Sequence, residues 1–202
     1  MSPEIPPLLP QPPRSPISRR SKLLIGLSLL PACFVAALIL LRLCGLVRPF
    51  SVYTGAMTPA VCSGDHFMVE DMTFLFRQPR RGDIVAFKTD GTASLPPSTL
   101  HIKRVAGEPG DHVRISGGKL FVNEKQVTLS NAAGEITYDL PPQAATFSFK
   151  AEMTIPSDCY FVLGDNSTNS LDSRYWGGVP RGNIIGRASF CYWPPKRIGG
   201  IK

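Results

Sequence analysis

The stretch Glu108-Pro109-Gly110-Asp111-His112-Val113-Arg114-Ile115 sets the expectation for the fold. A polar turn containing Pro and Gly leads directly into a run with β-branched residues, which is the local pattern of a strand that follows a tight turn. The same order recurs at residues 63–70, 80–88 and 116–123. No long segment with a 3.6-residue period follows residue 44. The sequence therefore predicts an all-β domain made mainly of antiparallel, coiled sheets.

Two stretches interrupt this regular pattern. Residues 89–99 are rich in Thr, Ser, Gly and Pro and are typical of a flexible connection. Residues 119–157 are predicted to form an inserted and less regular subdomain of the β domain.

The N-terminal part contains a long apolar run, LLIGLSLLPACFVAALILL, at residues 23–41. As a helix at ~1.5 Å per residue it spans about 28 Å, close to the ~30 Å of a bilayer's hydrocarbon core. A cleavable signal peptide is the alternative, but its apolar core would be shorter and a small-x-small cleavage site would follow it. We therefore expect a permanent transmembrane helix at residues 23–43, between a Pro-rich basic tail at 1–22 and the β domain at 44–202.

The formal net charge of +7 is concentrated around this helix. Residues 1–22 carry +3 and residues 42–48 carry +2, so residues 51–202 carry only +2. This distribution argues against nucleic-acid binding. The basic cluster at residues 18–22 predicts a cytoplasmic N-terminus by the positive-inside rule, although Arg42 and Arg48 oppose it from the other side. The β domain of a single-pass protein of the inner (cytoplasmic) membrane would then be extracytoplasmic.

The β domain contains three cysteines, Cys62, Cys159 and Cys191. Outside the cytoplasm they would meet an oxidising environment, in which disulfides form and persist. Because the number is odd, at most one pair can form within the domain, and Cys159–Cys191 is the candidate pair.

The histidines His66, His101 and His112 do not stand at metal-ligand spacing from cysteines or carboxylates. Tetrahedral metal sites normally show short, regular intervals between such ligands. We therefore expect neither a metal site nor another cofactor.

Aromatic residues gather at 50–53 (FSVY) and 73–76 (TFLF). They are consistent with ordinary core packing. They are also consistent with a surface that lies on the bilayer interface, where aromatic side chains are favoured. Both interpretations stay open because the domain begins within a few residues of the predicted helix.

Three segments carry the chemistry: TGAMTP at 54–59 followed by Gly64-Asp65, HIKRVAGEPGD at 101–111, and GDNSTNSLDSRYWG at 164–177. Together with the N-terminal helix, their order and spacing resemble bacterial signal peptidase I over nearly the whole chain beyond the Pro-rich tail. The resemblance implies a membrane-bound serine endopeptidase with a Ser/Lys dyad. It would act at the lipid bilayer on exported preproteins, removing signal peptides that carry small residues before the cleavage site.

The first family motif reads Ser-x-Ser-Met-x-Pro, and its second serine is the nucleophile. The matching residue here is Ala56. Thr54 matches the upstream serine, whose hydroxyl forms the oxyanion hole with the backbone N–H at the nucleophile position. Lys103 matches the general base, and Ser170 matches the serine that hydrogen-bonds the base and orients it.

The resemblance also implies supporting roles. Asp172 and Arg174 match a structural ion pair that holds the loop of Ser170. Met57 and Pro59 are candidates for an apolar substrate pocket, although ordinary packing explains them equally well. Gly164 is interpreted as a turn former.

A lysine has a reference pKa of ~10.4, so it is protonated at neutral pH and cannot accept a proton from serine. Lysine bases in enzymes operate at a pKa of ~7–8, which burial among apolar groups can produce. Ile102 and Val105 beside Lys103 agree with such a setting.

The methyl group of Ala56 cannot attack a carbonyl, and loss of the nucleophile in a related triad costs ~10⁶ in rate. Four explanations are open. The chain is a signal peptidase I with a recent or deliberate Ser→Ala change, or a pseudoprotease that binds signal peptides without cleaving them. Alternatively Thr54 is the nucleophile, or the chain is another Ser/Lys protease, such as a pilin-processing enzyme.

Overall fold

The computed structural model describes residues 18, 30–37, 39–40, 42–91, 95, 97–139 and 152–202. The chain divides into two compact units, Met1–Leu43 and Cys44–Lys202. In the first unit, residues 30–37, 39–40 and 42–43 are helical. Within the described ranges no helix has the length and apolar character needed to cross a bilayer. The expected transmembrane helix at 23–43 lies partly outside these ranges, as does nearly all of the expected tail at 1–22.

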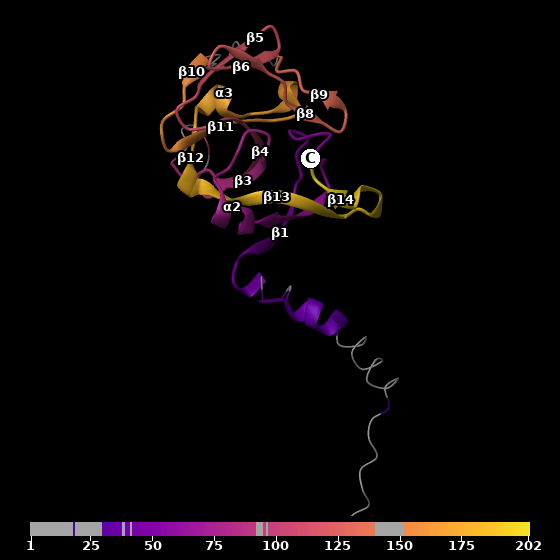
Figure 1. Cartoon of the computed structure of the whole chain (residues 1–202). Helices are drawn as coiled ribbons and strands as arrows, with labels where there is room; N and C mark the ends of the chain where they lie inside the picture. Colours follow the sequence, from indigo (N-terminus) through magenta and orange to yellow (C-terminus); the bar gives the residue numbers. More distant parts are fainter. Residues whose placement is uncertain are drawn as a thin grey trace, which may run out of the picture. The chain divides into compact units, whose positions relative to one another are not determined.

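The second unit is built on an eight-stranded sheet whose neighbouring strands are antiparallel (Figure 1). The strand order is β1-β2-β13-β3-β4-β11-β12, and β14 pairs with β13. The strands are β1 Val47–Ser51, β2 His66–Glu70, β3 Ile84–Lys88, β4 Leu100–Gly107, β11 Cys159–Leu163, β12 Val179–Pro180, β13 Ile184–Trp193 and β14 Gly199–Gly200.

A four-stranded sheet in the order β10-β5-β6-β7 and the hairpin β8-β9 complete the strands. These are β5 His112–Ser116, β6 Lys119–Val122, β7 Lys125–Val127, β8 Ser130–Asn131, β9 Gly134–Glu135 and β10 Glu152–Thr154. The helices of this unit are short: α2 Met72–Phe76, η2 Ser167–Asn169, α3 Ser173–Trp176, η3 Arg181–Asn183 and η4 Pro195–Arg197.

The expectation of a mainly antiparallel β domain is confirmed. The segments expected as strands at 66–70 and 84–88 coincide with β2 and β3, and those after the turns at 108–111 and 116–119 form β5 and β6. The stretch expected as an insertion, 119–157, contains the strands β6 to β10. The small sheet also includes β5, which precedes this stretch.

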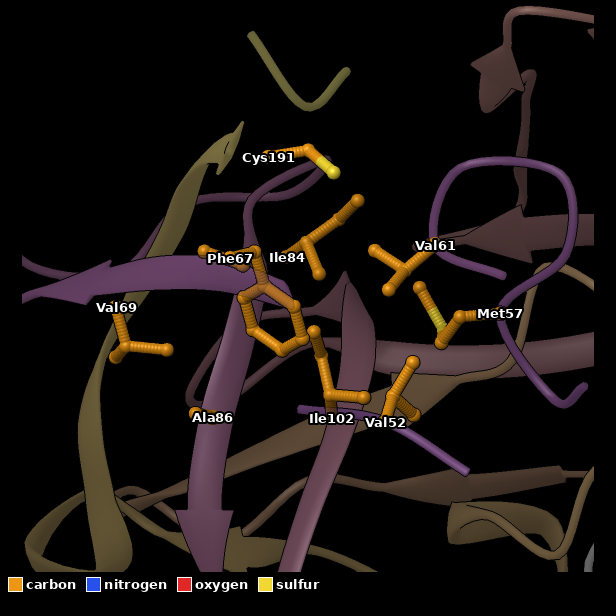
Figure 2. Packing of buried hydrophobic residues seen from close by; sticks show 10 residues of the cluster. Val52, Met57, Val61, Phe67, Val69, Ile84, Ala86, Ile102 and Cys191 are labelled. Atoms are coloured by element: carbon orange, nitrogen blue, oxygen red, sulfur yellow. The ribbon is translucent and has the colours of Figure 1, made fainter. Parts of the chain in front are cut away.

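Strand β3 is buried on both faces, and this explains its uninterrupted apolar sequence. One face of β3 contributes to a first core, made of Val52, Met57, Val61, Phe67, Val69, Ile84, Ala86, Ile102, Ala188 and Cys191 (Figure 2). The other face contributes to a second core, made of Phe74, Val85, Phe87, Val105, Tyr160, Val162, Trp176, Val179 and Ile184.

A third core joins the small sheet to β4 and β11, with Ala106 and Phe161 among its members. Gly107 marks the tightest contact, because a Cβ there would overlap the side chains of Ile155 and Val113. The small sheet is therefore packed directly onto the strand that carries Lys103.

The aromatic segments divide between the two interpretations. Phe74 is buried in the second core, and Phe50 packs against the first core. In contrast, Tyr53, Leu75 and Phe76 are exposed, with Phe76 at 88%. Core packing thus accounts for one part of each segment and leaves the other part at the surface.

The expected Cys159–Cys191 disulfide is wrong, because all five cysteines are free thiols. Cys191 is buried in the first core, whereas Cys159 packs against the third core. The Cys191 thiol donates to the carbonyl of Trp193 at 3.2 Å. The positions of Cys159 and Cys191 along the chain do not reveal that the two side chains pack in different cores.

Free thiols are directly countable. Alkylation of the denatured protein, purified from an oxidising compartment and kept without reductant, is expected to modify all five cysteines. Intact-mass spectrometry measures the number of alkyl groups. A product with two fewer alkyl groups, restored to full labelling by prior reduction, would contradict the structure.

Candidate active site

A cavity of about 600 Å³ opens where three segments of the second unit meet. It is lined by residues 51–54 and 56 after β1, by residues 100–103 of β4, and by residues 168–171 and 175 around η2 and α3. Four residues singled out from the sequence line it together: Thr54, Ala56, Lys103 and Ser170.

Lys103 lies in β4, opposite Val85 of β3, and only 4% of it is exposed. Burial lowers the pKa of its amine to about 8, and the positive charge of Arg174 acts in the same direction. The carboxylates of Asp172 and Asp165 oppose this effect by favouring the charged amine. Above pH 8 the amine is therefore mostly neutral, which is the state that can accept a proton.

Ala56 lies in a turn after β1, in which the Thr58 N–H donates to the Gly55 carbonyl at 3.2 Å. The turn is anchored from one side, because Met57 and Val61 point from this loop into the first core (Figure 2). Ala56 itself is 7% exposed and lines the cavity. Thr54, two residues earlier, is exposed at the cavity wall.

Ser170 is buried, and its Oγ has no hydrogen-bond partner among residues 42–91, 97–139 and 152–202. The hydrogen bond to Lys103 that the sequence led us to expect is therefore not formed in this structure. An unpaired hydroxyl in a buried setting carries a desolvation cost, which a suitably placed donor or acceptor would remove.

Gly164 has a packing role in place of the turn-forming role expected from the sequence. Its φ lies outside the positive range that favours glycine, but a Cβ there would overlap the Ser170 side chain. The same Cβ would lie 2.6 Å from the Ala56 carbonyl oxygen. Only a residue without a side chain allows the segment of Ser170 to lie this close to the segment of Ala56.

Asp172 and Arg174 form a fully buried ion pair, with Arg174 Nε and Nη2 donating to the two carboxylate oxygens at 2.8 and 2.9 Å. Asp172 also accepts from the Gly164 N–H at 3.0 Å. Arg174 donates further to the carbonyls of Ser167 and Asp139, at 2.7 and 3.0 Å. Because each charge has several hydrogen-bond partners, the pair fixes the loop from Gly164 to Arg174 without leaving an uncompensated buried charge.

A second buried ion pair was not anticipated from the sequence. Arg104 Nε and Nη2 donate to the two carboxylate oxygens of Asp165, at 2.8 and 2.7 Å. Arg104 follows Lys103 in β4, and Asp165 follows Gly164. The only available signal was that both residues lie inside the segments selected for their chemistry.

His101 was also missed as a site residue. It lines the cavity on the same strand as Lys103 and packs on Phe87 at 5.9 Å between ring centroids. Burial lowers the pKa of its imidazole, and the positive charge of Lys103 lowers it further. The imidazole is therefore neutral at pH 7.

The two candidates for the substrate pocket do not line this cavity. Met57 is 1% exposed and belongs to the first core, while Pro59 lines a different cavity near η4. Their placement supports the packing interpretation.

No group of three or more His, Cys, Asp or Glu side chains is arranged to hold a metal ion in the part of the chain that the structure describes.

An antiparallel β domain with a buried, readily deprotonated amine in an open cavity is the arrangement expected of a hydrolase that uses lysine as its base. The profile of the family "Signal peptidase, peptidase S26" matches residues 25–193. The chain belongs to this family.

The relatives found by sequence agree with this assignment. The chain is 38% identical to "Probable signal peptidase I-2" of Synechocystis sp. over 149 residues, which cover 72% of this chain and 63% of that protein. It is 35% identical to "Thylakoidal processing peptidase 1, chloroplastic" of Arabidopsis thaliana, over 76% of this chain and 44% of that protein. The crystal structure of a signal peptidase I from Enterococcus faecalis V583 matches with 27% identity and a TM-score of 0.41, over 56% of this chain and 98% of that one.

The burial of Lys103 has a cost that stability measurements detect. Since its pKa falls from 10.5 to about 8, Lys103→Met is expected to raise the free energy of unfolding at pH 7 by about 3 kcal/mol. Between pH 8 and 10.5 the native lysine is already neutral while the unfolded chain still binds a proton. The contribution of Lys103 to the free energy of unfolding therefore rises over this range, and the advantage of Lys103→Met shrinks.

Denaturant unfolding from pH 7 to 10.5 measures this advantage. The matched control is Lys88→Met, which makes the same exchange at an exposed lysine on the neighbouring strand. An advantage of Lys103→Met that stays constant over the whole range would contradict the lowered pKa.

Gly164→Ala is expected to destabilise the domain by about 1–3 kcal/mol, because the new methyl group overlaps Ser170 and the Ala56 carbonyl. Gly182→Ala is the control, since a Cβ there meets no atom within 4 Å and its φ is not positive. Thermal unfolding compares the two variants. Equal thermal stability of the Gly164→Ala and Gly182→Ala variants would contradict the close approach of the segments of Ser170 and Ala56.

Proposed function

We propose that this chain is a signal peptidase I in which alanine occupies the nucleophile position. In its serine form it would be a membrane-anchored endopeptidase that cleaves N-terminal signal peptides from exported preproteins. The observation that carries this proposal is the buried amine of Lys103, with a pKa near 8, in the cavity that Ala56 also lines. A lysine that only bound substrate would gain nothing from this burial, whereas a general base requires it.

We assign the roles from the family resemblance, and the four principal residues line one cavity: Thr54, Ala56, Lys103 and Ser170. Lys103 is the general base, and residue 56 carries the nucleophile when it is serine. The Thr54 hydroxyl and the backbone N–H of residue 56 form the oxyanion hole. Ser170, whose Oγ is otherwise unpaired, orients the lysine amine. Asp172 and Arg174 keep the loop of Ser170 in place.

In the serine form, neutral Lys103 takes the proton from the serine hydroxyl as its oxygen attacks the scissile carbonyl. The oxyanion hole stabilises the negative charge of the tetrahedral intermediate. The lysine ammonium then gives its proton to the leaving amine, which departs and leaves an acyl-enzyme. Water, deprotonated by the same lysine, hydrolyses the ester. With Ala56 no bond to the substrate can form, so the chain as written binds without cleaving.

The location follows from the sequence of the first unit. We propose that residues 23–43 anchor the protein in the inner membrane with the N-terminus in the cytoplasm and the β domain outside. Exposed apolar side chains on and near α2, among them Leu75 and Phe76, fit contact with the bilayer interface.

A second candidate function is a pseudoprotease that holds signal peptides without cleaving them. Ala56 itself favours this function, because its methyl group cannot act as a nucleophile. The two candidates share the ligand and differ only in whether residue 56 suffices to restore cleavage.

Ala56→Ser is expected to cleave a preprotein whose signal ends in Ala-x-Ala, at a rate at least ~10⁴-fold above that of the unmodified chain. The value of kcat/KM should rise with pH and level off above an apparent pKa near 8, because only neutral Lys103 accepts the serine proton. In this variant, Thr54→Val should lower kcat by ~10²–10³ through loss of one oxyanion donor. Gel assays of the processed preprotein measure all three effects.

The outcomes separate the candidates. Tight signal-peptide binding by both forms, with no cleavage by either, would overturn the peptidase proposal in favour of the pseudoprotease. Cleavage by the unmodified chain that Thr54→Val abolishes would assign the nucleophile to Thr54.

A further inference from the structure

One residue of a distant segment, Asn166, makes two hydrogen bonds to the loop of residues 55 and 56. Its side-chain Nδ2 donates to the Gly55 carbonyl at 3.1 Å. Its backbone N–H donates to the next carbonyl, that of Ala56, at 3.0 Å. Two consecutive carbonyls of the nucleophile loop therefore accept hydrogen bonds from one residue, which lies 111 positions beyond Gly55 in the chain.

Asn166 occupies the N-cap position of η2, where asparagine side chains commonly accept a hydrogen bond from the following helical turn. Here the side chain makes no such cap bond. The turn is closed by the backbone alone, through the Asn169 N–H and the Asn166 carbonyl at 3.0 Å. The amide of Asn166 is directed to the loop of residue 56 and does not stabilise its own helix.

The Gly55 carbonyl accepts two hydrogen bonds, one from the nearby Thr58 N–H at 3.2 Å and one from Asn166 Nδ2, and only the bond from Asn166 comes from a distant segment. A trans peptide unit is planar, and its C=O and N–H point in opposite directions. Holding the Gly55 carbonyl therefore also fixes the direction of the Ala56 N–H, which belongs to the same unit. That N–H donates to no acceptor among residues 42–91, 97–139 and 152–202, so it remains free to bind a substrate oxygen.

The same segment is fixed to the strand of the base. Asp165, immediately before Asn166, forms the buried two-point ion pair with Arg104, immediately after Lys103. Residues 165 and 166 thus connect β4 to the loop of residue 56. Four hydrogen bonds of 2.7 to 3.1 Å connect the two sides: two join Arg104 to Asp165, and two join Asn166 to the carbonyls of residues 55 and 56.

We infer that Asn166 is a positioning residue that aims the backbone N–H of residue 56 at the substrate carbonyl oxygen and keeps it in register with Lys103. This inference rests on the proposed function, because it assigns that N–H to the oxyanion hole. Asn166 touches neither the scissile bond nor the lysine, and it acts only through the peptide unit that it holds.

The first test uses the full chain in detergent micelles, with Ala56 unchanged, and needs no catalysis. NMR relaxation measures the order parameter of the Ala56 N–H, which is expected near 0.85 in the unmodified protein and below about 0.6 in Asn166→Ala. The control is Asn183→Ala, which removes a comparable hydrogen bond from an asparagine amide to the carbonyl of Asp90. Neither Asn183 nor Asp90 lines the cavity. Equal Ala56 order in all three proteins would overturn the inference.

The second test adds Asn166→Ala or Asn166→Leu to the Ala56→Ser variant. Both are expected to lower kcat by ~10–10²-fold with KM changed less than about twofold, because the oxyanion donor is misaligned while the binding cavity is intact. The apparent pKa near 8 should not move, since Lys103 keeps its surroundings. If KM rises by as large a factor as kcat falls, or if the apparent pKa shifts, Asn166 has a merely structural role. Either result would overturn the inference.

The two tests separate this inference from the proposed function. If Ala56→Ser does not cleave, the peptidase proposal fails, and the order parameter of Ala56 still decides whether Asn166 holds the peptide unit.

Discussion

The amine of Lys103 is the group on which the rest of the site depends. A lysine is normally solvated and charged, so enclosing it in β4 requires that nearly every surrounding side chain be placed against it. Arg174 adds a positive charge nearby, while Asp172 and Asp165 limit how far the pKa falls. Because both carboxylates are engaged by arginines, neither is free to form a direct ion pair that would keep the amine charged.

The two arginine–aspartate pairs therefore serve a geometric purpose beyond their own modest contribution to stability. Asp172–Arg174 fixes the loop of Ser170, and Arg104–Asp165 ties the start of that loop to the strand of the base. Gly164 lets the loop approach the turn of residue 56 closely. In consequence, three segments that are far apart in the sequence meet around one cavity.

Much of this arrangement was predictable from the sequence, because the relevant signals are local. Turns with Gly and Pro before β-branched runs located β2, β3, β5 and β6, since strand formation there depends on neighbouring residues. The motif resemblance selected Thr54, Ala56, Lys103 and Ser170, which do line one cavity. Contacts between distant residues were not predictable. The separation of Cys159 from Cys191, the Arg104–Asp165 pair and the hydrogen bonds of Asn166 to residues 55 and 56 all depend on how the sheets pack, which spacing along one chain does not encode.

The pKa of Lys103 is the quantity whose measurement tests this account most directly. Selective ¹³C labelling of lysine side chains allows the Cε resonance of Lys103, assigned with Lys103→Met, to be followed by NMR from pH 6 to 11 in the full chain. The account predicts a midpoint near 8 for this lysine, well below the reference value of ~10.4 for lysine in model peptides. A Lys103 midpoint at or above ~10 would contradict it, since the amine would then be solvated and unable to act as a base near neutral pH.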